Sequence, residues 1–137
     1  MLTLTRTVTF HALHRLYRLE WSAERNREVF GPLSEEPPHA HDYQCAVTVS
    51  ADGGAPPDLL VDLALLDAIL ADEIVTPFHG RYLNRDVPAF AQTLPTCEAL
   101  AAHCYRRIAA RLPPGVRLER VRVSEDPTLH ADCSRPA

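Results

Sequence analysis

The chain has 137 residues, a formal net charge of −4, 46% hydrophobic residues and 23% charged residues. This length can bury a core without disulfides or a structural metal, so we expect one domain spanning residues 1–137. The acidic balance gives no basic stripe for nucleic acid, and no apolar run approaches the roughly 20 residues that cross a membrane. The absence of a signal-peptide pattern and of Cys-x-x-Cys spacing among four cysteines predicts a cytoplasmic protein with free thiols.

The first predicted element is a half-buried strand over residues 2–10, where apolar residues alternate with threonine or arginine. Residues 18–36 are charged and are followed by two prolines, so we predict a long loop there with at most one helical turn. Long loops in small domains are usually functional or disordered. The position of this loop, directly before two histidines, favours a functional role.

A second strand is predicted over residues 43–50, where apolar residues again alternate. Apolar residues then recur at helical spacing from Leu63, with Asp62 as N-cap and Thr76-Pro77 as the stop. Two paired strands before a helix begin the pattern of an α+β domain.

A second helix is predicted from the cap residue Thr96 to the Pro-Pro-Gly sequence at 113–115. Residues 116–124 alternate as a strand, with a phase slip at Glu119-Arg120 that predicts a β-bulge. The fold class is therefore α+β, with two helices on one face of an antiparallel sheet.

His39 and His41 are the pattern that points most directly to chemistry. Residues i and i+2 of a strand face the same way, so this segment presents two imidazoles side by side. His14, from the end of the first strand, would complete a set of three nitrogen ligands, which with one open position is typical of catalytic zinc. The pair alone would also suit polar surface histidines. His11 lies three residues before His14 and is expected to face the opposite side.

Seven segments, taken in order, resemble the 6-pyruvoyltetrahydropterin synthase family, which includes the 6-carboxytetrahydropterin synthases. They read F-x-A-x-H-R-L at 10–16, N-x-x-x-F-G at 26–31, H-x-H-x-Y at 39–43, V-D-L-x-x-L at 61–66, F-H-G-x-x-L-N at 78–84, P-T-x-E-x-L-A at 95–101 and V-x-V-x-E at 121–125. The resemblance implies the tunnelling fold, in which the sheets of several subunits join into a barrel, and a homo-oligomer formed as a hexamer of two stacked trimers.

The resemblance also implies a zinc-dependent lyase that acts on the side chain of 7,8-dihydroneopterin triphosphate or a related reduced pterin. His14, His39 and His41 are the implied zinc ligands. Glu125 would bind the N–H edge of the pterin ring, with Thr96 and Glu98 contributing at the start of the second helix. The Thr-x-Glu pattern is equally that of an ordinary helix cap.

Two departures from the family pattern affect the catalytic residues. The family's cysteine falls four or six residues before the first histidine of the pair, where this chain has Glu35 or Leu33, and its Asp-His pair falls on His79-Gly80. One hypothesis is that Glu35, or Glu36 as the alternative, serves as the base and His79 as proton relay. The resemblance to a branch of the family with glutamate in place of the cysteine implies a 6-hydroxymethyl pterin as product in that case, while the 6-pyruvoyl and 6-carboxy pterins stay open as products of the enzyme. The other hypothesis is a non-catalytic paralogue that binds zinc and pterin, with two solvated loop acids.

Overall fold

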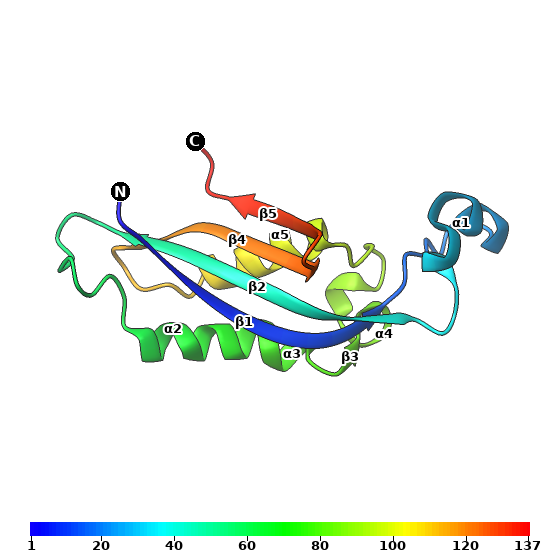
Figure 1. The fold of residues 1–137 in the computed structure, drawn as a ribbon, viewed down its shortest axis with the longest axis horizontal. Helices are drawn as coiled ribbons and strands as arrows, with labels where there is room; N and C mark the ends of the chain where they lie inside the picture. Colours follow the sequence, from blue (N-terminus) through cyan, green and yellow to red (C-terminus); the bar gives the residue numbers. More distant parts are fainter.

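In the computed structural model, which describes residues 1–137, a five-stranded sheet with the strand order β3-β1-β2-β4-β5 forms the centre of the fold (Figure 1). Its strands are β1 (Thr3–His14), β2 (His39–Ala51), β3 (Arg81–Tyr82), β4 (Val116–Asp126) and β5 (Leu129–Ser134). All neighbouring pairs are antiparallel except β1 with β3, which is parallel.

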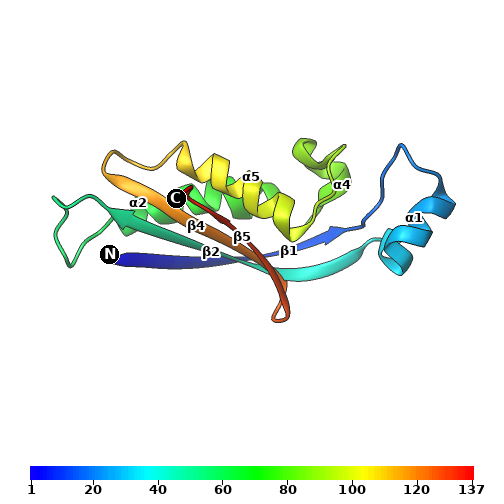
Figure 2. The same ribbon diagram turned by 90° about the horizontal axis from the view of Figure 1, so that it is seen from above.

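The helices divide into a layer on the sheet and a separate lobe. They are α1 (Ala23–Phe30), α2 (Leu63–Leu70), α3 (Thr76–Phe78), α4 (Leu83–Asp86) and α5 (Cys97–Ala109), and a π-helical turn at Ala71–Val75 joins α2 to α3. Figure 2 shows α2 and α5 on one face of the sheet, whereas α1 lies beyond the ends of β1 and β2. None of these helices is long and apolar enough to span a membrane. This arrangement confirms the predicted α+β class.

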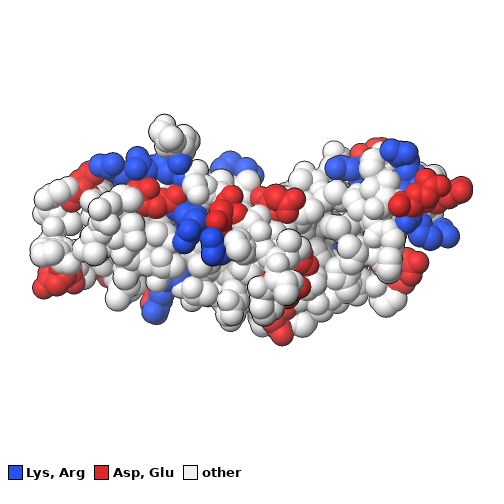
Figure 3. All heavy atoms as spheres, turned by 45° about the horizontal axis from the view of Figure 1, so that its top comes forward, with Lys and Arg blue, Asp and Glu red and all other residues white.

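The core lies between the sheet and the α2/α5 layer. It is built from the residues of β1, β2 and β4 that face the helices and from the apolar stripes of the helices, including Phe10, Tyr43, Val47, Val121, Leu66, Ile69, Leu100 and Ile108. Phe10 and Tyr43 lie opposite each other in the β1–β2 ladder, and their rings stack with centroids 4.9 Å apart. The other face of the sheet carries polar residues, because side chains alternate along each strand. On the face shown in Figure 3, side chains of both charges are interspersed.

Three segments differ from the predictions. Strands β1 and β2 continue past the predicted ends, to His14 and from His39, because their ladder pairs these two residues. The predicted loop contains α1, whose N-cap Ser22 accepts a hydrogen bond from the Arg25 N–H and whose C-terminus is followed by Gly31 at a positive φ of 59°.

The predicted stop at Thr76-Pro77 is also wrong, because the helix runs on to Phe78. The π-helical turn changes the hydrogen-bond spacing directly before Pro77, which has no N–H to donate. The predicted β-bulge is confirmed: Thr48 pairs with Arg120 and Val49 with Leu118, which leaves Glu119 unpaired. The sequence pattern does not predict β5, the strand that forms a hairpin with β4.

Two asparagine side chains hold the segment that follows β1. Asn84 accepts a hydrogen bond from the Arg15 N–H at 3.0 Å and donates one to the Arg15 carbonyl at 2.9 Å. Asn26 makes the same pair of bonds to the main chain of Arg18, at 2.7 and 3.0 Å. These amides replace the strand partner that the chain loses after His14, and so fix the end of β1.

We expect Asn84→Ala to lower the free energy of unfolding by about 1–3 kcal/mol, because it leaves two main-chain groups of Arg15 without partners. Urea unfolding at one fixed protein concentration measures this loss. Gln92→Ala is the matched control, since Gln92 is an exposed amide that lines the same cavity as Asn84 and makes no side-chain hydrogen bond. Equal stabilities of the two variants would contradict the proposed role of Asn84.

Candidate metal and ligand site

Three histidines meet at the end of the β1–β2 ladder. The register pairs His14 with His39 and Ala12 with His41, so all three imidazoles project from the helix-covered face. The ring centroids of His39 and His41 lie 4.5 and 5.1 Å from that of His14 and 5.1 Å from each other. One ring nitrogen of each histidine lies within 4.8 Å of the other two. The structure therefore brings together the three ligands that the sequence predicts.

The surroundings of His14 favour its neutral form, which can bind a metal ion. It is 3% exposed, and its Nδ1 lies 2.7 Å from the carbonyl oxygen of Pro95, which fixes the proton on Nδ1 and leaves Nε2 with a free lone pair. Burial lowers the pKa of His14 to about 4, with smaller contributions from the charges of His39 and His41. Burial also lowers the pKa of His39. A metal ion thus meets unprotonated imidazoles at neutral pH.

His41 provides the test of whether a metal ion fits. Its Nε2 is buried and has no hydrogen-bond partner. The Glu125 Oε2 approaches to 2.6 Å, but the contact lacks hydrogen-bond geometry and is an ion-pair contact only. Buried polar atoms are rarely left without a partner, and a metal ion bound by the three imidazoles would satisfy this one. The donor set, three nitrogens, suits zinc.

Glu125 and α5 form the wall beside the histidines. The Glu125 side chain, at the end of β4, is 15% exposed. The Cys97 Sγ lies 3.8 Å from the Glu125 Oε1. Thr96 acts as the N-cap of α5 and accepts a hydrogen bond from the Ala99 N–H at 3.2 Å, whereas Glu98 is exposed in the first turn. Thr96 and Glu98 line an open cavity of about 470 Å³.

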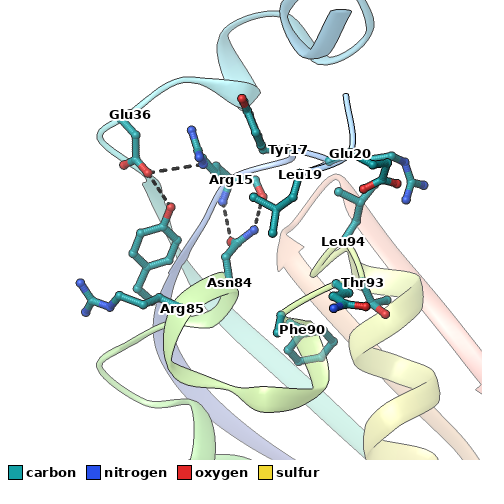
Figure 4. Close-up of a pocket in the computed structure, with 14 residues that line it drawn as sticks. Arg15, Tyr17, Leu19, Glu20, Glu36, Asn84, Arg85, Phe90, Thr93 and Leu94 are labelled. Atoms are coloured by element: carbon teal, nitrogen blue, oxygen red, sulfur yellow. Dashed lines mark hydrogen bonds and ion pairs between the residues drawn. The ribbon is translucent and has the colours of Figure 1, made fainter. Parts of the chain in front are cut away.

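A larger cavity of about 730 Å³ lies between the segment after β1 and the loop before α5, as the close-up in Figure 4 shows. Glu36 lines this cavity, and its Oε1 accepts a 2.8 Å hydrogen bond from the Tyr82 hydroxyl. The same oxygen lies 3.4 Å from the Arg15 Nε (Figure 4). Glu35 is exposed, does not line the cavity and makes no side-chain hydrogen bond or ion pair. The two loop acids therefore have different surroundings.

His79 lies at the edge of β1 and does not join the histidine cluster. Its Nδ1 accepts a hydrogen bond from the His11 N–H at 3.0 Å, and the Gly80 N–H donates to the His11 carbonyl at 2.7 Å. Gly80 has a φ of +74°, a conformation that other residues rarely adopt. Position 80 thus serves the turn that brings β3 beside β1. His11 faces the open side of the sheet, as predicted, and its Nδ1 lies 2.8 Å from the Asp42 carboxylate.

Two contacts of the site were missed from the sequence. No role was predicted for Cys97, although its place between Thr96 and Glu98 in the P-T-x-E segment was a signal that it lies near the ligand. Tyr43 packs its ring against those of His14 and His41, and its hydroxyl lies 3.3 Å from the His14 Nδ1. Burial, with a further effect from the charge of Glu125, raises the Tyr43 pKa, so this hydroxyl stays protonated.

Comparisons with known proteins agree with this fold. A family model described as 6-pyruvoyl tetrahydropterin synthase matches residues 3–136. The 6-pyruvoyl tetrahydrobiopterin synthase of Homo sapiens is 33% identical over 121 residues, which cover 88% of this chain and 83% of the human protein. The structure of Caenorhabditis elegans 6-pyruvoyl tetrahydropterin synthase matches with a TM-score of 0.87 at 25% identity, over 98% of this chain and 96% of the other. The Plasmodium vivax 6-pyruvoyl tetrahydropterin synthase matches over the full length of both chains with a TM-score of 0.60 at 11% identity. The chain therefore belongs to the 6-pyruvoyl tetrahydropterin synthase family and has its tunnelling fold.

Proposed function

We propose that this protein is a zinc-dependent lyase that acts on the side chain of 7,8-dihydroneopterin triphosphate or a related reduced pterin. The observation that carries the proposal is the cluster of three imidazoles beside the largely buried Glu125 carboxylate, in a chain of this family. The relatives that match are named 6-pyruvoyl tetrahydrobiopterin synthases, a name that supports a pterin as the substrate. The four free cysteines support a reducing compartment, the cytoplasm.

His14, His39 and His41 are the residues that would hold the zinc. When bound there, zinc would act as a Lewis acid that lowers the pKa of hydroxyl groups on the pterin side chain. The Pro95 carbonyl keeps the His14 ring in the orientation and tautomer that present Nε2 to the cluster. The chain itself therefore orients the ligand set.

Glu125 is proposed to recognise the pterin ring. A carboxylate accepts two parallel hydrogen bonds from a guanidine-like N–H edge, and such charge-assisted pairs are strong when water is largely excluded. Glu125 is mostly buried and lies directly beside His41, so a ring bound to it would present its side chain to the metal. Thr96 and Glu98 line the adjacent cavity and are proposed to contact the ligand there.

The proton transfer is assigned to the loop before the histidine pair. The Glu36 carboxylate is already engaged, because its Oε1 accepts a hydrogen bond from Tyr82 and contacts Arg15. Glu35 has a free carboxylate, so we favour Glu35 as the base, with Glu36 as the alternative and His79 as relay. Variants of the Plasmodium vivax protein replace a glutamate described as a catalytic residue, so a member of this fold uses a carboxylate in that role.

A second function, a non-catalytic protein that binds zinc and pterin, is favoured by one observation. Glu35 and His79 are exposed in the single chain, and neither contacts the histidine cluster. If Glu35 and His79 take no part in the reaction, the residues that bind zinc and pterin would be present without a base to accept the proton. Turnover of dihydroneopterin triphosphate, followed by chromatography of the released pterin and side-chain fragment, separates the two functions and identifies the product.

The site is proposed to be completed in a homo-oligomer. Strand β3 pairs only with Ala12 and Leu13 of β1, so the rest of this β1 edge is open, and β5 leaves the opposite edge open. Open edges of this length tend to pair with another chain. A hexamer of two trimers would place residues from a neighbouring chain at each site, which allows His79 to act in the site of a neighbour.

We expect the purified protein to hold about one zinc per chain, and His41→Ala to weaken zinc binding about a hundredfold or more, because one of three ligands is lost. Elemental analysis after dialysis against buffered zinc measures both. His11→Ala is the control, since His11 faces the open side of the sheet. A parental protein that gains no metal after incubation with zinc would refute the metal site.

We expect Glu35→Gln to lower turnover by about a hundredfold or more, because the amide keeps the shape of the side chain but cannot accept the proton. Zinc content and pterin affinity should stay unchanged. Glu36→Gln is the paired variant, with a smaller expected effect. Parental rates in both variants would remove the loop acids from the mechanism. An inactive parental protein would favour the binding function.

Light scattering should give a mass six times the chain mass of 15.3 kDa at micromolar concentration, because the open edges of β1 and β5 are then paired. The alternative outcome, a monodisperse species near 15.3 kDa, would show that the sheet is stable with open edges and that the site is built from one chain.

A further inference from the structure

Cys97 is the first residue of α5 and lies directly behind the Glu125 carboxylate. It is 3% exposed, and its thiol is positioned to donate to the Glu125 Oε1 across 3.8 Å. The other oxygen of the same carboxylate, Oε2, lies 2.6 Å from the His41 Nε2. The carboxylate therefore lies between α5 and β2, and its hydrogen bond comes from the α5 side.

The Cys97 sulfur is a thiol rather than a thiolate. Burial raises the pKa of Cys97 to about 12, and the adjacent Glu125 charge contributes in the same direction. A protonated thiol is a hydrogen-bond donor, although a weak one, and it suits the anionic acceptor that it faces. Such a buried thiol is a poor nucleophile, so Cys97 does not replace the family's catalytic cysteine.

The direction of the Glu125 carboxylate matters for ligand selection. A carboxylate recognises a planar N–H edge only when both oxygens lie in the plane of the ring, and free rotation of the group weakens that match. The fixed N-terminus of α5, capped by Thr96, makes Cys97 a rigid support for Oε1. Of the side chains around Glu125, Cys97 is the hydrogen-bond donor to Oε1.

We propose that Cys97 is a positioning residue that orients the Glu125 carboxylate, and that this orientation gives the site its selectivity for a 2-amino pteridine over a 2-oxo pteridine. The inference rests on the proposed function, since it requires Glu125 to bind the ring. It assigns a role in ligand selection to a thiol that neither binds metal nor transfers a proton.

The experiment compares the dissociation constants of pterin and lumazine, which carry an amino group and an oxo group at position 2, for the zinc-loaded protein and its variants. We expect Cys97→Ala to weaken pterin binding about three- to tenfold and to leave lumazine binding nearly unchanged, because only the amino ring presents two adjacent N–H donors to the oriented carboxylate. Cys97→Ser keeps a donor and should restore at least half of the selectivity. Zinc content should be parental in both.

Cys104→Ala is the matched control, since Cys104 is a fully buried cysteine on the same helix and does not contact Glu125. Should Cys97→Ala fail to fold, Cys97→Val tests the same loss of a donor with more of the side-chain volume kept. A selectivity in the folded Ala or Val variant that equals the parental value overturns the inference, as does an equal loss in the Ser variant. Failure of the parental protein to prefer pterin would instead reject the proposed role of Glu125.

Discussion

The antiparallel register of β1 and β2 decides where every proposed metal ligand lies. Because His14 pairs with His39, the three imidazoles share one face and one end of the sheet. A slip of one residue would turn the side chains of β2 to the opposite face and separate His39 and His41 from His14. The same register places Phe10 on Tyr43 and aligns the apolar residues that bury the core, so the packing that stabilises the fold also assembles the site.

Around this ladder, the polar groups of the site are supported from the helix side. In the loop that precedes α5, the Pro95 carbonyl forms a hydrogen bond with His14. In α5 itself, the Cys97 thiol forms one with Glu125. Isolated charges in such a position would be strongly disfavoured, and the cluster avoids this because burial keeps His14 neutral. The result is a cluster of three ring nitrogens within 4.8 Å of one another, with a single carboxylate beside it.

Much of this could be predicted from the sequence, because it depends on local periodicity and on short motifs. The alternation in residues 116–124 predicted β4, and the phase slip in it predicted the bulge at Glu119. The His-x-His spacing predicted that His39 and His41 share one face of the sheet. Long-range contacts could not be predicted in this way. The extension of β1 to His14 depends on its partner strand, α1 depends on a cap in a charged segment, and the bond between Tyr82 and Glu36 joins residues 46 positions apart. The contrast between Glu35 and Glu36 therefore appears only in the folded chain.

The proposed metal site depends on the β1–β2 register, which places three histidine nitrogens beside the Glu125 carboxylate. X-ray absorption at the zinc edge, with and without a bound pterin, tests it most directly. We predict about three imidazole nitrogens at roughly 2.0–2.1 Å from zinc and a fourth, oxygen ligand that alone changes when pterin binds. A sulfur ligand at about 2.3 Å, or a first shell with fewer than three imidazoles, would contradict the account.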